Sequence, residues 1–147
     1  QNYGANQPER IRKGIRSAGL TSAIFCVCIS ALVCLFAGPL MGIFIDPSQT
    51  DIIAAGVHYL RIEGACYIGI GILFLLYGYY RAVNQPLMSV ILTIASLGTR
   101  VALAYLLSAT VLGVTGIWLS VPIGWALADI IGIGYYLVKK KGAEQNV

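Results

Sequence analysis

The sequence predicts an all-α membrane protein with four antiparallel transmembrane helices. Hydrophobic residues make up 58% of the 147-residue chain and charged residues only 11%, whereas a soluble domain carries about 25% charged residues. Four apolar stretches follow one another along the chain, each near the roughly 20 residues that a helix needs to cross a bilayer. Only short connections separate them, so neighbouring spans should pack antiparallel. The surplus apolar surface must therefore face the lipid bilayer.

The first predicted span covers residues 17–36. Residues 1–16 before it are polar and basic, and we expect them to form a cytoplasmic segment that leads in from a preceding helix. The whole transmembrane region is then residues 17–147. The uncharged run continues beyond the first span, but Pro39 lacks a backbone donor and weakens the helix there.

The second span is predicted over residues 57–80. A polar turn at residues 46–51 precedes it, because aspartate, proline and serine are typical of turns. Asp51 is the expected N-cap of the helix. Glu63 lies in the first turns of this span, and residues 64–80, which follow it to the end of the span, are uncharged.

The third and fourth spans are predicted over residues 87–110 and 117–138. Pro86 precedes the third span, and proline favours the first position of a helix. Three consecutive lysines end the fourth span and open a cytoplasmic tail, residues 139–147.

The distribution of basic residues predicts the orientation. Positively charged residues resist translocation and stay in the cytoplasm. The connections at residues 38–51 and 111–116 contain no lysine or arginine. Both ends of the chain are therefore expected on the cytoplasmic side of the cell inner (plasma) membrane. The basic residues on that side are Arg10, Arg12, Lys13, Arg16, Arg81, Lys139, Lys140 and Lys141.

Arg100 is the most unusual residue, because a charge inside a span is costly unless it faces protein or a water-filled cavity. With Ser89, Thr93 and Ser96 it forms one polar stripe at helical spacing. Arg100 lies about 21 Å and Asp129 about 15 Å from the cytoplasmic end at ~1.5 Å per residue. An arginine side chain can bridge that offset.

Glu63 is a second candidate partner for Arg100, at about 27 Å on the same scale. Two interpretations of these charges stay open. They either form an ion pair that locks the helices together, or they line a cavity.

Several kinds of site are excluded by the sequence. The net charge of +4 comes from basic residues beside apolar spans, unlike the basic patch of a nucleic-acid-binding domain. All four cysteines lie within apolar runs, where they suit packing better than metal binding. No nucleophile–base arrangement or phosphate-binding loop is present, so we expect neither an enzyme nor a cofactor. Gly124, Ala128 and Gly132 form a small-residue stripe suited to helix packing.

Several short motifs resemble the multidrug and toxin extrusion (MATE) transporters, in the same order and at similar spacing. The N-terminal segment resembles the family pattern G-Q-N-x-G-A-x-x-x-x-R, and Arg100 matches an arginine common in one bacterial branch. The remaining motifs are Tyr59–Ile62, Tyr80-Arg81, Gln85-Pro86, Gly113–Trp118 and Pro122–Trp125.

This resemblance implies helices nine to twelve of a twelve-helix transporter, within its C-terminal lobe. The other eight helices would then be partners of this piece. The family exports drugs or amphipathic and cationic metabolites, small organic substrates, in exchange for H⁺ or Na⁺. Candidates for its substrate cavity or for helix locking are Arg100, Asp129, Glu63, Ser96, Thr93 and Tyr67.

Ile70 stands near the position where some members have a coupling aspartate, so the coupling ion is expected to bind in the missing part of the protein. Two other functions stay open. One is a flippase of related fold for a lipid-linked sugar, and the other is a membrane assembly subunit without transport activity.

Overall fold

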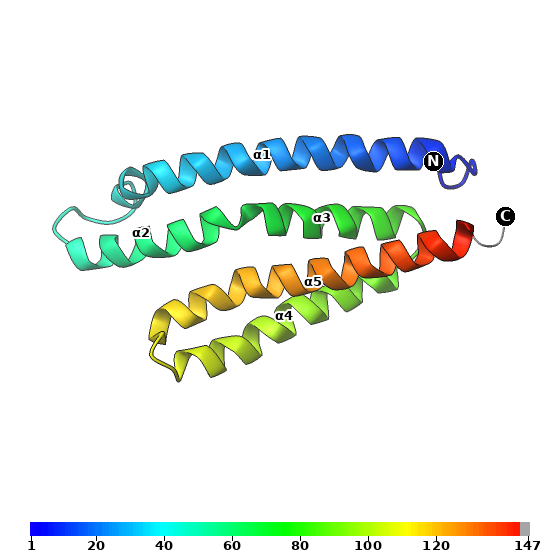
Figure 1. Ribbon diagram of the computed structural model, residues 1–147. Coiled ribbons are helices and arrows are strands. Elements are labelled where there is room, and N and C mark those ends of the chain that lie inside the picture. The colour runs from blue at the N-terminus through cyan, green and yellow to red at the C-terminus, as the bar shows by residue number, and fades with distance from the viewer. Residues whose placement is uncertain (145–147) are drawn as a thin grey trace.

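The computed structural model describes residues 1–144, with side chains described through Lys139. Figure 1 shows its helices lying side by side, with α1 at one edge, α4 at the other, and α2 and α3 end to end between them. Three helices are long and apolar enough to cross a membrane, and the bent pair α2 and α3 makes a fourth span if counted as one. The helices are α1 (Pro8–Gly42), α2 (Thr50–Ala65), α3 (Tyr67–Ala82), α4 (Pro86–Ser108) and α5 (Gly113–Glu144).

Helix α1 begins well before the predicted span. Pro8 occupies its first turn, followed by Glu9, and both residue types suit a helix N-terminus. The arginines and lysine that follow are good helix formers, so the basic segment predicted to precede the span is itself helical. The helix is kinked at Phe36 (φ −103°, ψ 17°), three residues before Pro39. Proline disrupts the backbone geometry of the preceding turn, which explains this position.

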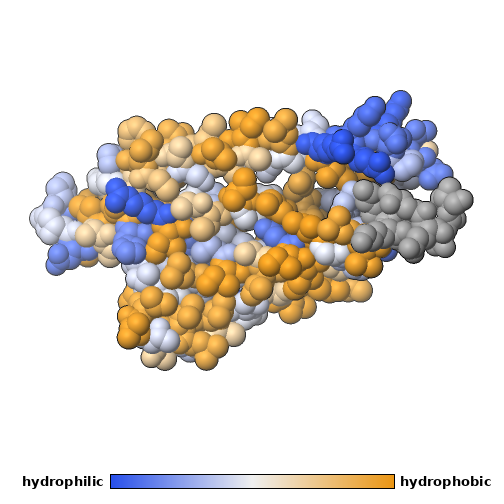
Figure 2. All heavy atoms as spheres, viewed as in Figure 1, coloured by the Kyte–Doolittle hydropathy of each residue, from blue (hydrophilic) through white to orange (hydrophobic). Residues whose placement is uncertain are grey.

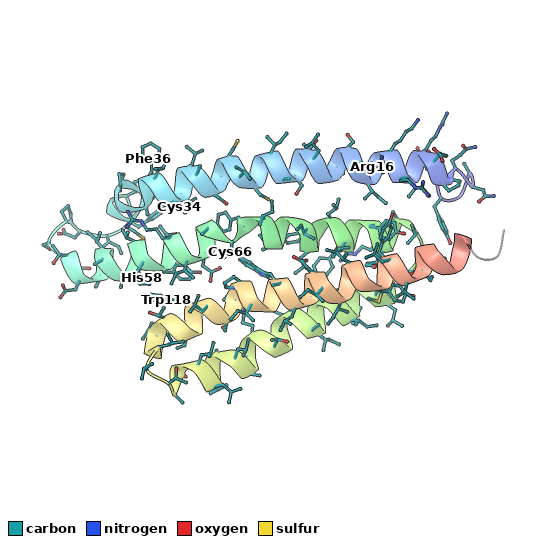
Figure 3. The ribbon with its side chains drawn as sticks, in the orientation of Figure 1. Arg16, Cys34, Phe36, His58, Cys66 and Trp118 are labelled. Carbon is teal, nitrogen blue, oxygen red and sulfur yellow. The ribbon has the colours of Figure 1, made fainter. Side chains whose placement is uncertain are left out.

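The second predicted span corresponds to two helices that are bent relative to each other. Helices α2 and α3 meet at Cys66, which has non-helical angles (φ −106°, ψ 9°), and their axes differ by 49°. Figure 3 labels Cys66 at this junction. Gly64 lies just before it and packs closely on α1, since a Cβ there would lie 2.9 Å from Val33 Cγ1. A glycine inside a helix weakens it, and this contact helps to fix the bend.

The turn before α2 also differs in detail from the prediction. The N-cap position is held by Gln49, and Asp51 lies within the first turn, where its charge still favours the helix dipole. The aspartate that organises this turn is Asp46, because the backbone N–H and hydroxyl of Ser48 both donate to Asp46 Oδ1, over 2.9 and 2.6 Å. These hydrogen bonds lower the pKa of Asp46 below its ordinary value.

The two remaining turns follow from residues that tolerate a left-handed backbone. Asn84 (φ 56°) lies in the turn after α3, and Gly113 (φ 51°) begins α5. Glycine and asparagine adopt such angles at low cost. Pro86 is the first residue of α4, which confirms the predicted proline start.

The buried core lies where α3, α4 and α5 meet. Helix α1 packs against α2 and α3, but within the described residues no Cα of α1 lies within 8 Å of a Cα of α5. Most large apolar side chains elsewhere are exposed, as expected of surfaces that face lipid or further helices. Figure 2 shows hydrophobic surface along the body of the molecule and hydrophilic surface at both ends, most of it at the N-terminal end of α1. The core residues are Leu73, Leu76, Tyr80, Val83, Met88, Leu92, Trp125 and Ala128.

The predicted small-residue stripe of α5 lies at its helix contacts. A Cβ at Gly124 would lie 2.7 Å from the backbone oxygen of Ser96, and one at Gly132 would lie 2.6 Å from Leu76 Cδ1. A four-residue spacing drifts by about 40° per step around a helix of 3.6 residues per turn. The stripe therefore contacts α4 first and reaches α3 nearer its C-terminal end.

Candidate functional site

A cavity of about 450 Å³ lies among α2, α3, α4 and α5, close to the break at Cys66. Each of the four helices contributes to its wall, so it exists only in the assembled bundle. Cavities that bind small molecules have volumes of about 300–1,000 Å³. Its polar and aromatic lining residues are Tyr59, Glu63, Tyr67, Arg100, Ser120 and Trp125.

Two opposite charges, Glu63 and Arg100, face this cavity. Glu63 is only 4% exposed, and its Oε1 atom has no hydrogen-bond partner among the described residues. Arg100 is half-buried. Its Cβ lies close to Gly124 of α5, because a Cβ built at Gly124 would be 3.5 Å from it. A buried carboxylate oxygen without a donor is costly, and a polar ligand in the cavity could supply that donor.

Asp129, the first candidate partner of Arg100, is not among the residues that line the cavity. It is buried on α5, its Oδ1 atom has no partner within the described part of the chain, and its Oδ2 atom lies 3.8 Å from a Cβ built at Gly69. Gly69 belongs to the first turn of α3. The positive end of a helix dipole favours a carboxylate at this place.

The polar stripe of α4 divides between two neighbours. Ser89 and Ser96 are buried, whereas Thr93 is exposed. The Ser89 hydroxyl donates to the backbone oxygen of Tyr77 over 3.4 Å, and Thr93 Oγ1 lies 3.2 Å from the Tyr77 hydroxyl. Ser96 and Arg100 instead face α5. Only Arg100 of this stripe reaches the cavity.

Tyr67, the aromatic candidate, lines the cavity from the first turn of α3. It also borders a second, mostly apolar cavity of about 390 Å³ between α1 and α3. Tyr67 therefore separates the polar cavity from the α1 side of the bundle, and its ring offers an apolar surface to both.

Ser120 also lines the cavity, although it was not among the residues predicted to do so. It is 1% exposed, and its hydroxyl donates to the backbone oxygen of Ile117 over 2.6 Å. A signal was available, because Ser120 lies four residues before Gly124 and extends the small-residue stripe toward Gly116. For Tyr59 the available signal was its place in the motif Tyr59–Ile62.

The end of the bundle beyond this cavity is aromatic. The rings of His58 and Trp118 are centred 5.6 Å apart, and those of Tyr59 and Trp118 5.8 Å apart. Figure 3 labels His58 on α2 and Trp118 on α5 at this end. Such rings suit the boundary between lipid and water.

The arrangement suits binding better than catalysis. Within the described residues, no three histidine, cysteine, aspartate or glutamate side chains are grouped as metal ligands would be. The cavity combines a carboxylate, a guanidinium and aromatic rings, which can orient a polar group and cover an apolar body.

Comparison with known proteins identifies the family. The profile of the MatE family matches residues 1–106, which include α1 to α3 and most of α4 and contain Glu63, Tyr67 and Arg100. No curated protein and no solved structure gives a significant match to the chain. The family match covers well over half of the sequence and confirms the resemblance seen in the short motifs. The chain therefore belongs to the MatE family, whose members are multi-helix membrane proteins of efflux transport rather than enzymes.

Proposed function

We propose that this chain contributes part of the C-terminal lobe of a secondary antiporter, which exports drugs or amphipathic and cationic metabolites in exchange for H⁺ or Na⁺. The family match supports transport. The observation that carries the finer proposal is the buried Glu63 carboxylate, whose Oε1 atom has no hydrogen-bond partner among the described residues and which shares a cavity with Arg100. Buried ionisable groups inside membrane spans mark substrate or ion pathways.

The roles follow from the chemistry of the lining residues. Glu63 attracts the cationic group of a substrate, and Arg100 compensates its charge while the cavity is empty. Tyr67 and Trp125 contact the apolar body of the substrate, since aromatic faces attract both apolar groups and cations. A site beside the broken helix pair suits alternating access, because substrate sites of secondary transporters occur at interrupted helices near the membrane midplane.

Transport by the complete protein that contains this chain tests the proposal. Purified protein is reconstituted into liposomes with ethidium as the cationic probe, and a proton or sodium gradient is imposed. We expect ethidium movement that depends on one of the gradients. Glu63→Gln should reduce kcat/KM for ethidium at least about tenfold, because one charge-assisted contact in a membrane cavity is worth about 1.4 kcal/mol or more.

The matched control is Glu9→Gln, which removes an exposed carboxylate at the start of α1 and should leave ethidium transport unchanged. Ethidium movement that ignores both gradients would overturn the antiporter proposal. Absence of ethidium movement under either gradient, with an Arg100→Met/Asp129→Leu double variant that still folds and assembles normally, would instead favour an assembly role. Movement of a lipid-linked sugar in place of ethidium would favour the flippase.

A further inference from the structure

A further crevice lies at the opposite end of the bundle, where the N-terminal part of α1 faces the C-terminal part of α5. These helices do not contact each other within the described residues, and a cavity of about 490 Å³ occupies the space between them. It shares no residue with the cavity that contains Glu63. Its side walls include Tyr3, Arg12, Tyr79, Gln85, Tyr136 and Lys139.

The charge of this crevice is positive. Arg12 and Lys139 line it from α1 and α5, and among the residues whose side chains the structure describes no carboxylate lines it. Arg10 lines an adjoining cavity of about 400 Å³ that shares Tyr3 and Tyr79 with the first. Glu9, in the first turn of α1, lines neither. An anionic group between the two helices would be attracted by both walls.

The crevice is also amphipathic. Ile11, Ile15 and Val83 line both cavities, and the adjoining cavity continues between α1 and α3 past Leu75 and Phe74. The apolar track therefore leads from the charged end toward the middle of the bundle. Dimensions and chemistry of this kind suit a ligand with an anionic head and a hydrocarbon tail.

Aromatic rings mark the level of the lipid headgroups at this end. Tyr79 packs edge-on against Tyr136 with ring centres 5.3 Å apart, and Lys139 Nζ lies 5.6 Å from the ring centre of Tyr135. Tyrosine belts form at the boundary of the bilayer, and basic pockets between spans recognise anionic headgroups there. The crevice thus lies at the depth where a phospholipid headgroup lies.

Gln85 adds a more specific requirement. Its Oε1 atom is buried at the crevice and has no hydrogen-bond partner in the described part of the chain. An amide oxygen accepts hydrogen bonds, so a ligand that carries a donor next to its phosphate satisfies this oxygen once the amide turns toward the crevice. The hydroxyls of a glycerol headgroup provide such donors, whereas a bare phosphate monoester at neutral pH provides few.

From these contacts we propose that the crevice between α1 and α5 binds one anionic glycerophospholipid with a glycerol headgroup, such as phosphatidylglycerol. Its phosphate lies between Arg12 and Lys139, and its headgroup hydroxyl donates to Gln85. One acyl chain follows the track past Ile15 toward Phe74. The lipid joins two helices that have no direct contact with each other.

Native mass spectrometry of the complete protein tests this site. The protein is purified in mild detergent and equilibrated with equal amounts of phosphatidylglycerol, phosphatidic acid and phosphatidylethanolamine. We expect one tightly retained phosphatidylglycerol per chain. The Arg12→Gln/Lys139→Gln variant should retain at least about tenfold less, since each basic residue near the headgroup strengthens its attraction to anionic lipid. Gln85→Leu should abolish the preference for phosphatidylglycerol over phosphatidic acid.

The control variant is Lys13→Gln/Arg16→Gln, which removes two basic residues from the same end that do not line the crevice. It should retain phosphatidylglycerol like the unchanged protein, and all variants should elute as single species of unchanged size. Equal loss in both double variants would show general surface attraction and overturn the site. Equal retention of all three lipids would also overturn it. Displacement of the lipid by about 1 mM glycerol phosphate would overturn it as well, because it would show that a soluble headgroup binds the site with about millimolar affinity.

Discussion

Tyr80 is buried between α3 and α5, and its hydroxyl donates to the backbone oxygen of Gly132 over 2.6 Å. Its ring also packs against Tyr79 and Tyr135, with ring centres 5.1 and 5.8 Å away. One side chain therefore links two spans both by a hydrogen bond and by aromatic packing. A tyrosine in this position does more than mark the membrane boundary.

Replacement of Tyr80 by phenylalanine should keep the ring packing and remove the hydrogen bond. Interhelical hydrogen bonds in membrane proteins contribute on average about 0.6 kcal/mol, so we expect the melting temperature in detergent to fall by about 2 °C. Tyr105→Phe is the control. Tyr105 is 78% exposed, so removal of its hydroxyl should not change the melting temperature. An equal decrease in both variants would contradict a specific role for the Tyr80 hydroxyl.

The pairing of Arg100 is a residue-scale question that sequence position left open. Heights along the helices placed both Asp129 and Glu63 within reach. The rotation of α5 turns Asp129 toward Gly69 of α3, whereas Glu63 lines the same cavity as Arg100. The rotation of a helix about its axis depends on which side chains of the neighbouring helices fit together. It therefore cannot be predicted from the sequence of that helix alone.

At the scale of elements, glycine residues allow α5 to pack closely against its neighbours. Gly116, Gly124 and Gly132 each lie where an added Cβ would meet an atom closer than 3.0 Å. At Gly116 and Gly124 that atom belongs to the backbone of α4. Small residues permit such close approach of helices in membranes, where little hydrophobic force drives helices together.

Gly124→Ala should therefore destabilise the bundle. The new Cβ would lie 2.7 Å from the Ser96 backbone oxygen, and the backbone cannot move aside as a flexible side chain would. Overpacking of this kind costs about 1–3 kcal/mol, measurable as a lower melting temperature in detergent.

Gly134 provides the matched control on the same helix, since a Cβ there meets nothing within 4 Å. Gly134→Ala should leave the melting temperature unchanged or raise it slightly, because alanine is the better helix former. If the two alanine variants behaved alike, close contact between α4 and α5 would not be the reason for the glycine.

For the whole molecule, the main asymmetry is the charge at the two ends. The N-terminal end of α1 and the C-terminal part of α5 lie at one end of the bundle (Figure 1), and Arg12 and Lys139 line one crevice there. The connections between α1 and α2 and between α4 and α5 contain no lysine or arginine. This asymmetry is the basis of the expected orientation.

Labelling of introduced cysteines on intact cells tests the orientation. A membrane-impermeant maleimide should react with Ser48→Cys and Thr110→Cys, which lie in the connections without basic residues, and not with Asn2→Cys. Asn2→Cys should react only after the cells are opened. The unchanged protein serves as the background for its own four cysteines, three of which lie within α1 and one, Cys66, at the junction of α2 and α3. Reaction of Asn2→Cys in intact cells would reverse the orientation.

The all-α membrane fold, the proline start of α4 and the small-residue stripe of α5 could be predicted from the amino-acid sequence alone. These features depend on solvent and local backbone chemistry: hydrocarbon requires long apolar helices, and proline suits only certain helix positions. The family match supports the same architecture.

The break at Cys66 and the composition of the cavity, in contrast, depend on contacts between helices and could not be predicted from the sequence. Beside the bend, Gly64 packs closely on Val33 of another helix, and the cavity needs residues from four helices at once. Local propensity permits a straight helix at Cys66, and helical spacing permits either carboxylate as the partner of Arg100. Packing between helices sets the bend and brings Glu63, and not Asp129, to the cavity that Arg100 lines, because packing sets the axial rotation and bending of the helices.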